Sequence, residues 1–301
     1  MTIDRIESIT YGVEDLDTCV RFMDDWGLEQ TARTDTSADY RTLENQTLFL
    51  RLKDDPDLPE THETVATGRE VIWGVDTKES LDALAADLSR DRDVTEDADG
   101  TLHTRDDRNF AIGFKVAARQ TAQVEKHDLN FHEDIQRVNK AYFREGGAKP
   151  IRIGHVVYGV EAEDNMAAAE FYLERLNFRM SDRSTTTGTF MRSDGSDFHH
   201  SIFLIHRGDE RRFDHLAFEV SGFDELMAGG ASMLNKGWET QSGPGRHSLG
   251  SNIFWYFRNP CGGAIEYFTD MDRLTDDWEP GMWDDMPPYD QWMIHDALTN
   301  R

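Results

Sequence analysis

Three short apolar segments hold the most informative residues of this sequence: Gly154-His155-Val156-Val157, Asp214-His215-Leu216-Ala217-Phe218 and Ala264-Ile265-Glu266-Tyr267-Phe268. Each has the composition of a buried strand and contains one side chain that can bind a metal, namely His155, His215 or Glu266. The intervals between them are too long for a local motif, so the three residues can meet only if strands of one sheet bring them together. Two imidazoles and one carboxylate form the ligand set of non-haem Fe(II) sites that keep open coordination positions. The segments therefore predict a sheet that holds a metal site.

A simpler interpretation exists for each residue taken alone. Either histidine could be a hydrogen-bonded core residue, and Glu266 could pair with an arginine, because buried polar groups are usually satisfied in this way. The presence of all three in similar segments favours the metal site.

Other motifs near these segments extend the pattern. They are His199-His200-Ser201, Gly243-Pro244-Gly245-Arg246-His247, Phe254-Trp255-Tyr256 and Arg258-Asn259-Pro260-Cys261-Gly262. Together with the candidate ligands, they make the C-terminal half, from about Ile151 to Asp272, resemble the catalytic domain of type I extradiol catechol dioxygenases of the vicinal oxygen chelate superfamily. The intervals from His247 to Tyr256 and from Tyr256 to Glu266 are as in that family.

The resemblance implies a metal and a reaction. His155, His215 and Glu266 would hold Fe(II), and Mn(II) accepts the same ligand set. The enzyme would be an extradiol dioxygenase of aromatic catabolism, inserting both atoms of O2 into a catecholic substrate to give a muconic-semialdehyde-type product. Two alternatives stay open: a glyoxalase-like isomerase or lyase, in which the metal polarises an oxygen without redox change, and a non-catalytic binding or resistance protein of the same fold.

The resemblance also implies roles for residues beside the metal. His200 would be the acid/base catalyst, while His247 and Tyr256 would hydrogen-bond the substrate oxygens. We interpret His199 as a residue that supports its neighbour rather than reacting. One departure concerns Gly250, because some relatives have an aspartate three residues after the equivalent of His247.

The chain also shows an internal repeat. Tyr11-Gly12-Val13-Glu14 recurs as Tyr158-Gly159-Val160-Glu161, and residues 71–75 parallel residues 216–220. With the resemblance, this predicts an α+β, duplicated two-domain vicinal oxygen chelate fold. Each half would consist of paired βαβββ modules, forming a curved sheet around the metal in the C-terminal domain.

Alignment of the two halves indicates which of them is catalytic. The residues of the first half that align with His155, His215 and Glu266 are, in that order, Ser8, Glu70 and Gly113. These three residues do not form a comparable ligand set, so we expect the first half to be a scaffold without metal.

The expected domain limits follow from these patterns. They are a non-catalytic domain at 1–120, a linker at 121–150, the catalytic domain at 151–272 and a tail at 273–301. The linker contains Lys126-His127-Asp128 and His132-Glu133-Asp134, which suggest either a second metal site or, as we prefer, a solvated linker with a surface helix.

The tail joins large aromatic residues to acids, prolines and glycines, which break regular elements. It is expected either to cover the metal pocket as a lid or to pack against a neighbouring subunit.

Composition restricts the classes of protein to consider. The 301 residues are sufficient for two domains of ordinary size. The formal net charge of -26 argues against nucleic-acid or anionic-membrane partners, which require a basic surface. Only seven of the 32 basic residues are lysine, as in proteins of a high-salt cytoplasm or in an ordinary acidic enzyme.

Two cysteines, Cys19 and Cys261, are too few for a disulfide framework, and no segment resembles a signal peptide or a membrane span. We therefore expect a cytoplasmic protein, and a homo-oligomer such as a dimer or tetramer.

Overall fold

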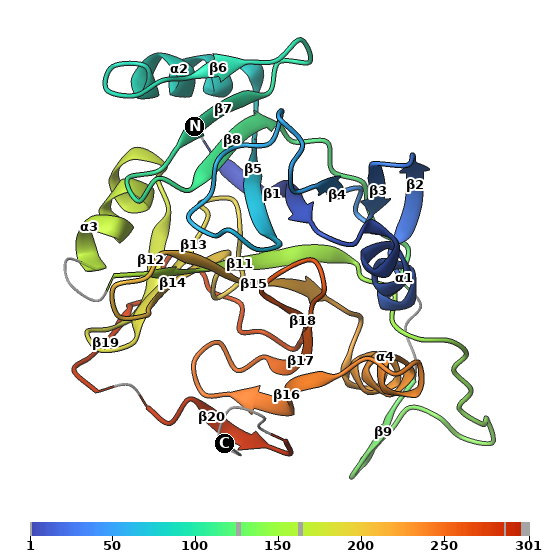
Figure 1. Cartoon of the computed structure of the whole chain (residues 1–301). Helices are drawn as coiled ribbons and strands as arrows, with labels where there is room; N and C mark the ends of the chain where they lie inside the picture. The colour runs from blue at the N-terminus through green and yellow to red at the C-terminus, as the bar shows by residue number, and fades with distance from the viewer. Residues whose placement is uncertain (1, 125–127, 162–164, 286, 296–301) are drawn as a thin grey trace.

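Two curved, mixed β-sheets form the framework of the chain in the computed structural model, which describes residues 2–124, 128–161, 165–285 and 287–295 (Figure 1). The first sheet has eight strands and the second has ten. This is the α+β arrangement that the sequence predicts.

The first half follows the order β-α-β-β-β twice. Its elements are β1 (Ile3–Val13), α1 (Leu16–Trp26), β2 (Glu29–Arg33), β3 (Ser37–Arg41), β4 (Thr47–Leu52), β5 (Thr67–Val75), α2 (Lys78–Leu88), β6 (Thr95–Glu96), β7 (Leu102–Arg105) and β8 (Ala111–Val116). The sheet order is β2-β3-β4-β1-β5-β8-β7-β6. Strands β1 and β5 therefore lie at its centre, where the two modules join.

The second half repeats this order. Its elements are β11 (Arg152–Val160), α3 (Asn165–Glu170) continued by the π-helical turn η1 (Phe171–Arg175), β12 (Arg179–Ser184), β13 (Gly188–Arg192), β14 (Ile202–His206), β15 (Arg212–Glu219), α4 (Phe223–Asn235), β16 (Thr240–His247), β17 (Ile253–Arg258) and β18 (Ala264–Thr269). Their order, β12-β13-β14-β11-β15-β18-β17-β16, is that of the first sheet strand for strand. The predicted duplication is therefore visible in the topology.

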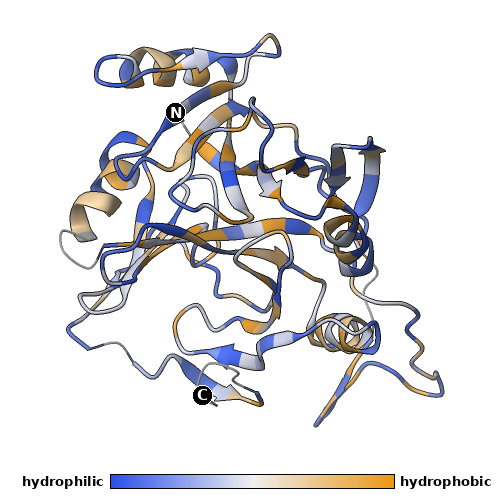
Figure 2. Ribbon diagram, viewed as in Figure 1, coloured by the Kyte–Doolittle hydropathy of each residue, from blue (hydrophilic) through white to orange (hydrophobic). Residues whose placement is uncertain are grey.

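Local chemistry determines where the helices begin and end. Helix α1 begins after Asp15, whose carboxylate accepts a hydrogen bond from Thr18 N, and ends at Gly27, which has a φ of 94°. A side-chain acceptor at the start and a left-handed glycine at the end satisfy main-chain groups that the helix leaves free. Figure 2 shows hydrophobic residues along the central strands and mixed hydropathy on the helices. No helix among the described residues is long and apolar enough to span a membrane.

The two halves are joined through buried contacts next to the central strands. Trp26 stacks on Tyr267 with ring centroids 3.5 Å apart, and the Tyr267 hydroxyl donates to the Trp26 carbonyl. The Gln46 amide bonds to main-chain atoms of Ile6 on β1 and of Ile153 on β11. These contacts fix the second sheet against the first.

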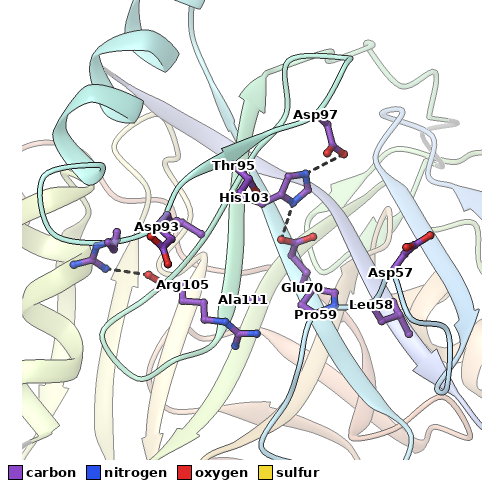
Figure 3. A pocket seen from close by; sticks show the side chains of 12 residues that line it. Asp57, Leu58, Pro59, Glu70, Asp93, Thr95, Asp97, His103, Arg105 and Ala111 are labelled. Atoms are coloured by element: carbon purple, nitrogen blue, oxygen red, sulfur yellow. Dashed lines mark hydrogen bonds and ion pairs between the residues drawn. The ribbon is translucent and has the colours of Figure 1, made fainter.

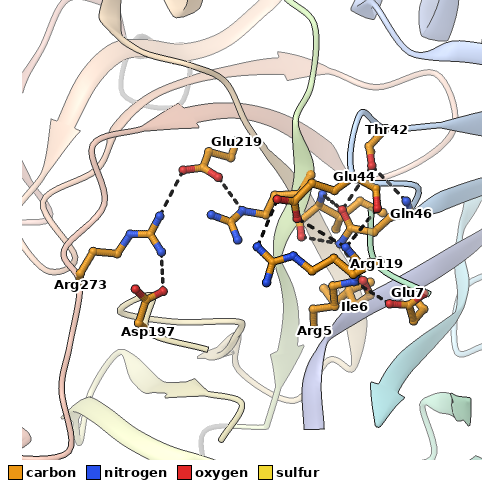
Figure 4. Close-up of polar contacts among 12 residues, drawn as sticks. Arg5, Ile6, Glu7, Thr42, Glu44, Gln46, Arg119, Asp197, Glu219 and Arg273 are labelled. Atoms are coloured by element: carbon orange, nitrogen blue, oxygen red, sulfur yellow. Dashed lines mark hydrogen bonds and ion pairs between the residues drawn. The ribbon is translucent and has the colours of Figure 1, made fainter. Parts of the chain in front are cut away.

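Ion pairs surround this junction (Figure 4). The Arg5 guanidinium contacts the carboxylates of Glu7 and Glu44, and Arg119 contacts Glu44 as well. Arg5, Glu7 and Glu44 are all buried, so their charges are compensated within the interface.

The linker differs from the expectation of a surface helix. Among its described residues, 121–150 contain no helix but a short hairpin, β9 (Asn130–Phe131) and β10 (Asp134–Ile135). The Asn130 side chain accepts a bond from Arg137 N and donates one to Arg137 O, which holds the two ends of the hairpin together. Side-chain bonds of this kind compete with helix formation, so the predicted surface helix was wrong.

The tail also differs from the expectation, since it contains two strands. Strand β19 (Gly281–Trp283) pairs in parallel with β12, and β20 (Asp290–Met293) pairs antiparallel with β16. Pro287 and Pro288 lie between the strands rather than in them, which explains why both can form. The tail therefore provides both edges of the ten-stranded sheet (Figure 1).

Candidate metal centre and active site

Three adjacent strands bring His155, His215 and Glu266 together. In the ladders, His155 on β11 lies opposite Ala217 of β15, and Ala217 lies beside Glu266 of β18. His215 is two residues before Ala217 and so projects from the same face of the sheet. The three potential ligand atoms lie within 4.8 Å of one another, and all three residues are buried.

The hydrogen bonds of this group fit a divalent metal. His155 Nε2 lies 3.0 Å from Glu266 Oε2, and His215 Nε2 lies 3.5 Å from the same oxygen. Within the described residues, His215 Nε2 has no hydrogen-bond partner although it is buried. A buried nitrogen aimed at a carboxylate and a second imidazole is suited to a metal ion, and this donor set is compatible with Fe(II) or Mn(II).

Neighbouring residues orient the candidate ligands. Asp214 Oδ1 lies 2.9 Å from His215 Nδ1, which leaves Nε2 of that ring for a metal. The Asn252 amide donates to Glu266 Oε1 at 3.1 Å. Neither role was predicted from the sequence, although Asp214 stands directly before His215, which was a usable signal.

The electrostatics of the group are strongly coupled. Burial raises the pKa of Glu266, but the imidazoles of His155 and His215 outweigh this and hold that pKa below its usual range. Burial lowers the pKa of His155, partly opposed by Glu266. Burial also acts to lower the pKa of His215, yet Asp214 and Glu266 raise it to about 9. The Glu266 carboxylate is therefore ionised, which is the form that a metal ligand needs.

His200 lies beside the candidate metal position. Its ring centroid is 4.2 Å from that of His155, and its Nδ1 is 3.1 Å from His199 Nδ1. His199 Nε2 in turn lies 2.7 Å from Asp182 Oδ2, and all of these side chains are buried. An ionised carboxylate can only accept hydrogen bonds, so the protons lie on His199 Nε2 and His200 Nδ1. This order leaves His200 Nε2 with a free lone pair.

Burial and the neighbouring histidines lower the pKa of His200 well below its usual value, so the ring is neutral. His199 thus lies between His200 and Asp182, and its supporting role stays a prediction. Asp182, at the end of this series of hydrogen bonds, was not identified from the sequence.

His247 and Tyr256 adjoin the second candidate histidine ligand, since the ring centroid of Tyr256 is 5.1 Å from that of His215. His247 Nε2 is 3.2 Å from the Tyr256 hydroxyl, and Tyr256 lies opposite Glu266 in the β17–β18 ladder. Burial raises the pKa of Tyr256 well above its usual value, so the phenol keeps its proton. His247 Nδ1 lies 2.8 Å from Asp290 Oδ1, a tail residue that the sequence analysis did not identify.

All six predicted site residues line or adjoin one cavity. Five of them form its polar walls, namely His155, His200, His215, His247 and Tyr256, and Glu266 contacts the first and third of these. The apolar walls are Val157, Phe190, Phe203, Leu249 and the aromatic ring of Tyr289. Among the described lining residues, none is a lysine, arginine, aspartate or glutamate.

The first half has a different pocket at the equivalent place (Figure 3). The ladders equate Glu70 with His215, because Glu70 lies beside Ala111 as His215 lies beside Ala264. The Glu70 carboxylate accepts a bond from His103 Nδ1 at 2.9 Å rather than facing a second potential ligand from β1. Among the described residues, the only group of three metal-capable side chains is that of the second half.

Comparisons with known proteins agree with this geometry. Residues 152–267 match the Glyoxalase/Bleomycin resistance protein/Dioxygenase superfamily. The chain is 33% identical to metapyrocatechase 2 of Cupriavidus necator over 125 residues, which are 42% of this chain and 38% of that protein. The match thus spans less than half of either protein.

Solved structures of similar fold cover nearly the whole chain. The Mn(II)-bound glyoxalase from Novosphingobium aromaticivorans has a TM-score of 0.77 at 21% identity, over 99% of this chain and 94% of its own. The 2,3-dioxygenase LapB from Pseudomonas sp. KL28 has a TM-score of 0.73 at 18% identity, over 94% of this chain and 98% of its own. A halotolerant catechol dioxygenase, BphC, has a TM-score of 0.75 at 14% identity, over 99% of this chain and 96% of its own.

The fold is the two-domain α+β fold of vicinal oxygen chelate proteins, and its second half contains a buried group of two histidines and one glutamate that could hold a metal ion. The second half of the chain is similar to the glyoxalase, bleomycin resistance and dioxygenase superfamily, whose model it matches over residues 152–267.

Proposed function

We propose that this protein is an Fe(II)-dependent extradiol dioxygenase that cleaves the ring of a catecholic substrate and gives a muconic-semialdehyde-type product. The observation that supports it is the arrangement of His200 beside His155, and of Tyr256 with its partner His247 beside His215, around one cavity. A site that only bound a metal would not need three additional proton-handling side chains.

The bound iron would supply the electron transfer between a catecholate and O2 that the two reactants do not achieve alone. Mn(II) is the alternative metal, since it accepts the same ligands. His155, His215 and Glu266 would hold the ion and leave neighbouring coordination positions open to substrate.

The residues around the metal would manage protons. Tyr256 and His247 form a hydrogen-bonded pair that can receive a catechol proton, because His247 Nε2 lies next to the Tyr256 hydroxyl. His200 starts neutral with a free lone pair on Nε2, so it can accept a proton at that atom and return it when the ring opens.

The walls of the cavity favour a neutral substrate with apolar substituents. Val157, Phe190, Phe203 and Leu249 offer hydrocarbon surface, and no permanently charged residue lines the described cavity to pair with a substrate carboxylate. The formal charge of -26 also disfavours anionic substrates at a distance. Alkyl-substituted or unsubstituted catechols are therefore preferred over catechol carboxylates.

The test is an oxygen-uptake assay of iron-loaded protein. Neutral catechols and catechol carboxylates are mixed with the protein without oxygen, and air is then admitted. We expect O2 consumption and a yellow ring-opened product, with higher kcat/KM for the neutral catechols. The similarity to a glyoxalase structure makes isomerase chemistry the second candidate. Turnover of a hemithioacetal together with no O2 uptake on any catechol would reject the proposal in favour of that candidate.

A further inference from the structure

The tail places an acidic side chain directly against a proton-handling residue of the site. Asp290 on β20 lies opposite His247 on β16 in the antiparallel ladder. Its Oδ1 is 2.8 Å from His247 Nδ1, and the two side chains are only 15% and 9% exposed. The contact therefore lies in a partly dehydrated place, where a hydrogen bond to a carboxylate is strong.

The strand that presents Asp290 is held by main-chain bonds on both sides of it. Ser248 N donates to the Tyr289 carbonyl at 3.1 Å, and Ile294 N donates to the Pro244 carbonyl at 3.0 Å. Because these bonds do not involve the Asp290 side chain, its replacement should leave β20 in place.

The Asp290 carboxylate determines which ring nitrogen of His247 carries the proton. An ionised carboxylate is an acceptor only, so His247 Nδ1 must carry a proton and donate it. The other ring nitrogen, Nε2, then has a lone pair, and the Tyr256 hydroxyl 3.2 Å away donates to it. Hydrogen bonds thus run in one direction, from Tyr256 through His247 to Asp290.

The other described neighbours of His247 fix the ring but supply no comparable acceptor. Phe254 stacks on the imidazole at a centroid distance of 3.9 Å, and Tyr289 meets it edge-on at 4.7 Å. Gly250, in the turn after His247, has no side chain to offer.

We propose that Asp290 is a positioning residue of the active site, which holds His247 in the tautomer that can accept a proton at Nε2. The inference rests on the dioxygenase function proposed above, in which the Tyr256–His247 pair receives a catechol proton. It also gives the C-terminal segment a defined function, since a residue more than forty positions after His247 completes the site.

The experiment compares Asp290→Ala and Asp290→Asn with Gln291→Ala in the iron-loaded protein. Alanine removes the acceptor, and asparagine keeps the shape but can donate as well as accept, so it no longer enforces one tautomer. Gln291 lies on the same strand and bonds to Ser248 Oγ, away from the site, so its variant controls for loosening of the strand. We expect kcat/KM to fall about tenfold to a hundredfold in both Asp290 variants, with unchanged metal content and with the control near wild type.

Two further measurements separate positioning from a structural effect. The first uses 4-nitrocatechol, whose absorption band reports its ionisation. When it is bound in the absence of oxygen, it should be less ionised in the Asp290 variants than in wild type. In a double-mutant cycle with His247→Asn, the Asp290 effect should largely disappear, because Asp290 acts through His247. Wild-type kinetics and nitrocatechol ionisation in Asp290→Ala, or full additivity with His247→Asn, would overturn the proposal.

Failure of the proposed function would give a different result. Nitrogen-15 NMR of the Zn(II)-loaded protein reports the His247 tautomer without any turnover. The positioning role is supported if His247 carries its proton on Nδ1 in wild type and no longer holds it there in Asp290→Ala. This result would count even if no catechol is oxidised. A proton on Nε2 in wild type would refute the role of Asp290 whatever the reaction is.

Discussion

Gln46 of the first half exchanges two hydrogen bonds with Ile153 of the second, two residues before the candidate ligand His155. Ile153 N donates to Gln46 Oε1 at 2.7 Å, and Gln46 Nε2 donates to the Ile153 carbonyl at 3.0 Å. The same amide also donates to the Ile6 carbonyl. One fully buried side chain thus connects the central strands of both sheets (Figure 4). Through this amide the first half fixes the strand that presents His155, which explains how it can contribute to the candidate site.

Replacement of Gln46 tests this connection. In Gln46→Leu, the buried main-chain groups of Ile6 and Ile153 lose their partner, which should lower the free energy of unfolding by about 2–4 kcal/mol. Urea unfolding measures the change, and Leu43→Ala, at a nearby exposed position, is the control. An unfolding midpoint equal to that of wild type would show that the amide is not needed at the junction.

The metal ligands are tested by single replacements. His155→Ala, His215→Ala and Glu266→Ala should each abolish tight metal binding and ring cleavage, because two remaining ligands hold a divalent ion poorly. Ser8→Ala, at the place in β1 that corresponds to His155, is the matched control. Metal content by atomic emission and folding by circular dichroism are the measurements. Full metal occupancy with near-normal turnover in any of the three variants would contradict the ligand assignment.

His200 is tested apart from metal binding. His200→Phe should keep iron and anaerobic catechol binding but slow the oxygen-dependent steps by about a hundredfold or more, since it removes the acid/base at Nε2. Rapid mixing of the anaerobic substrate complex with O2 measures this step. His206→Phe, a histidine at the other end of β14, serves as the control. If the oxygen-dependent rate is unchanged, His200 only supports the structure.

The sequence was informative where chemistry and pattern coincide. His155, His215 and Glu266 have the residue types of a ligand set and lie in strand-like segments, so their convergence could be predicted. Asp182 and Asp290 could not, because Asp182 is 17 residues from His199 and Asp290 reaches His247 only when β20 pairs with β16. The tail strands that provide this pairing are short and separated by prolines, and their sequence shows no strand pattern.

Replacement of Glu70 tests whether the first half is only a scaffold. Glu70→Ala should leave metal content and turnover unchanged, because β1 and β8 offer Ser8 and Gly113 in place of the other two ligands. A second metal per chain in wild type, lost in this variant, would contradict that conclusion.

The same variant has a pH-dependent effect on stability. The hydrogen bond to Glu70 is the main cause that raises the pKa of His103. A group with a raised pKa in the folded state stabilises the fold below its unfolded pKa, about 6.5, and this contribution is lost as the pH rises through the folded value. Glu70→Ala should therefore destabilise the protein more at pH 5.5 than at pH 9, as measured by thermal unfolding. A larger effect at pH 9 would show that the ion pair is not responsible.

Truncation after Arg273 tests the tail as a whole. The tail supplies Tyr289 to the wall of the cavity and Asp290 to His247, and its main chain at Gly281 donates a hydrogen bond to Asp182 Oδ1 at 2.8 Å. It therefore contacts both series of hydrogen-bonded side chains beside the candidate metal position, Asp182–His199–His200 and Asp290–His247, as a lid would.

Without the tail, the candidate metal ligands remain on β11, β15 and β18, so metal content should persist. Water would enter the cavity, KM for catechol should rise, and part of the oxygen consumed should appear as free hydrogen peroxide. Unchanged kinetics and coupling, combined with a shift from oligomer to monomer in light scattering, would instead identify the tail as an assembly element.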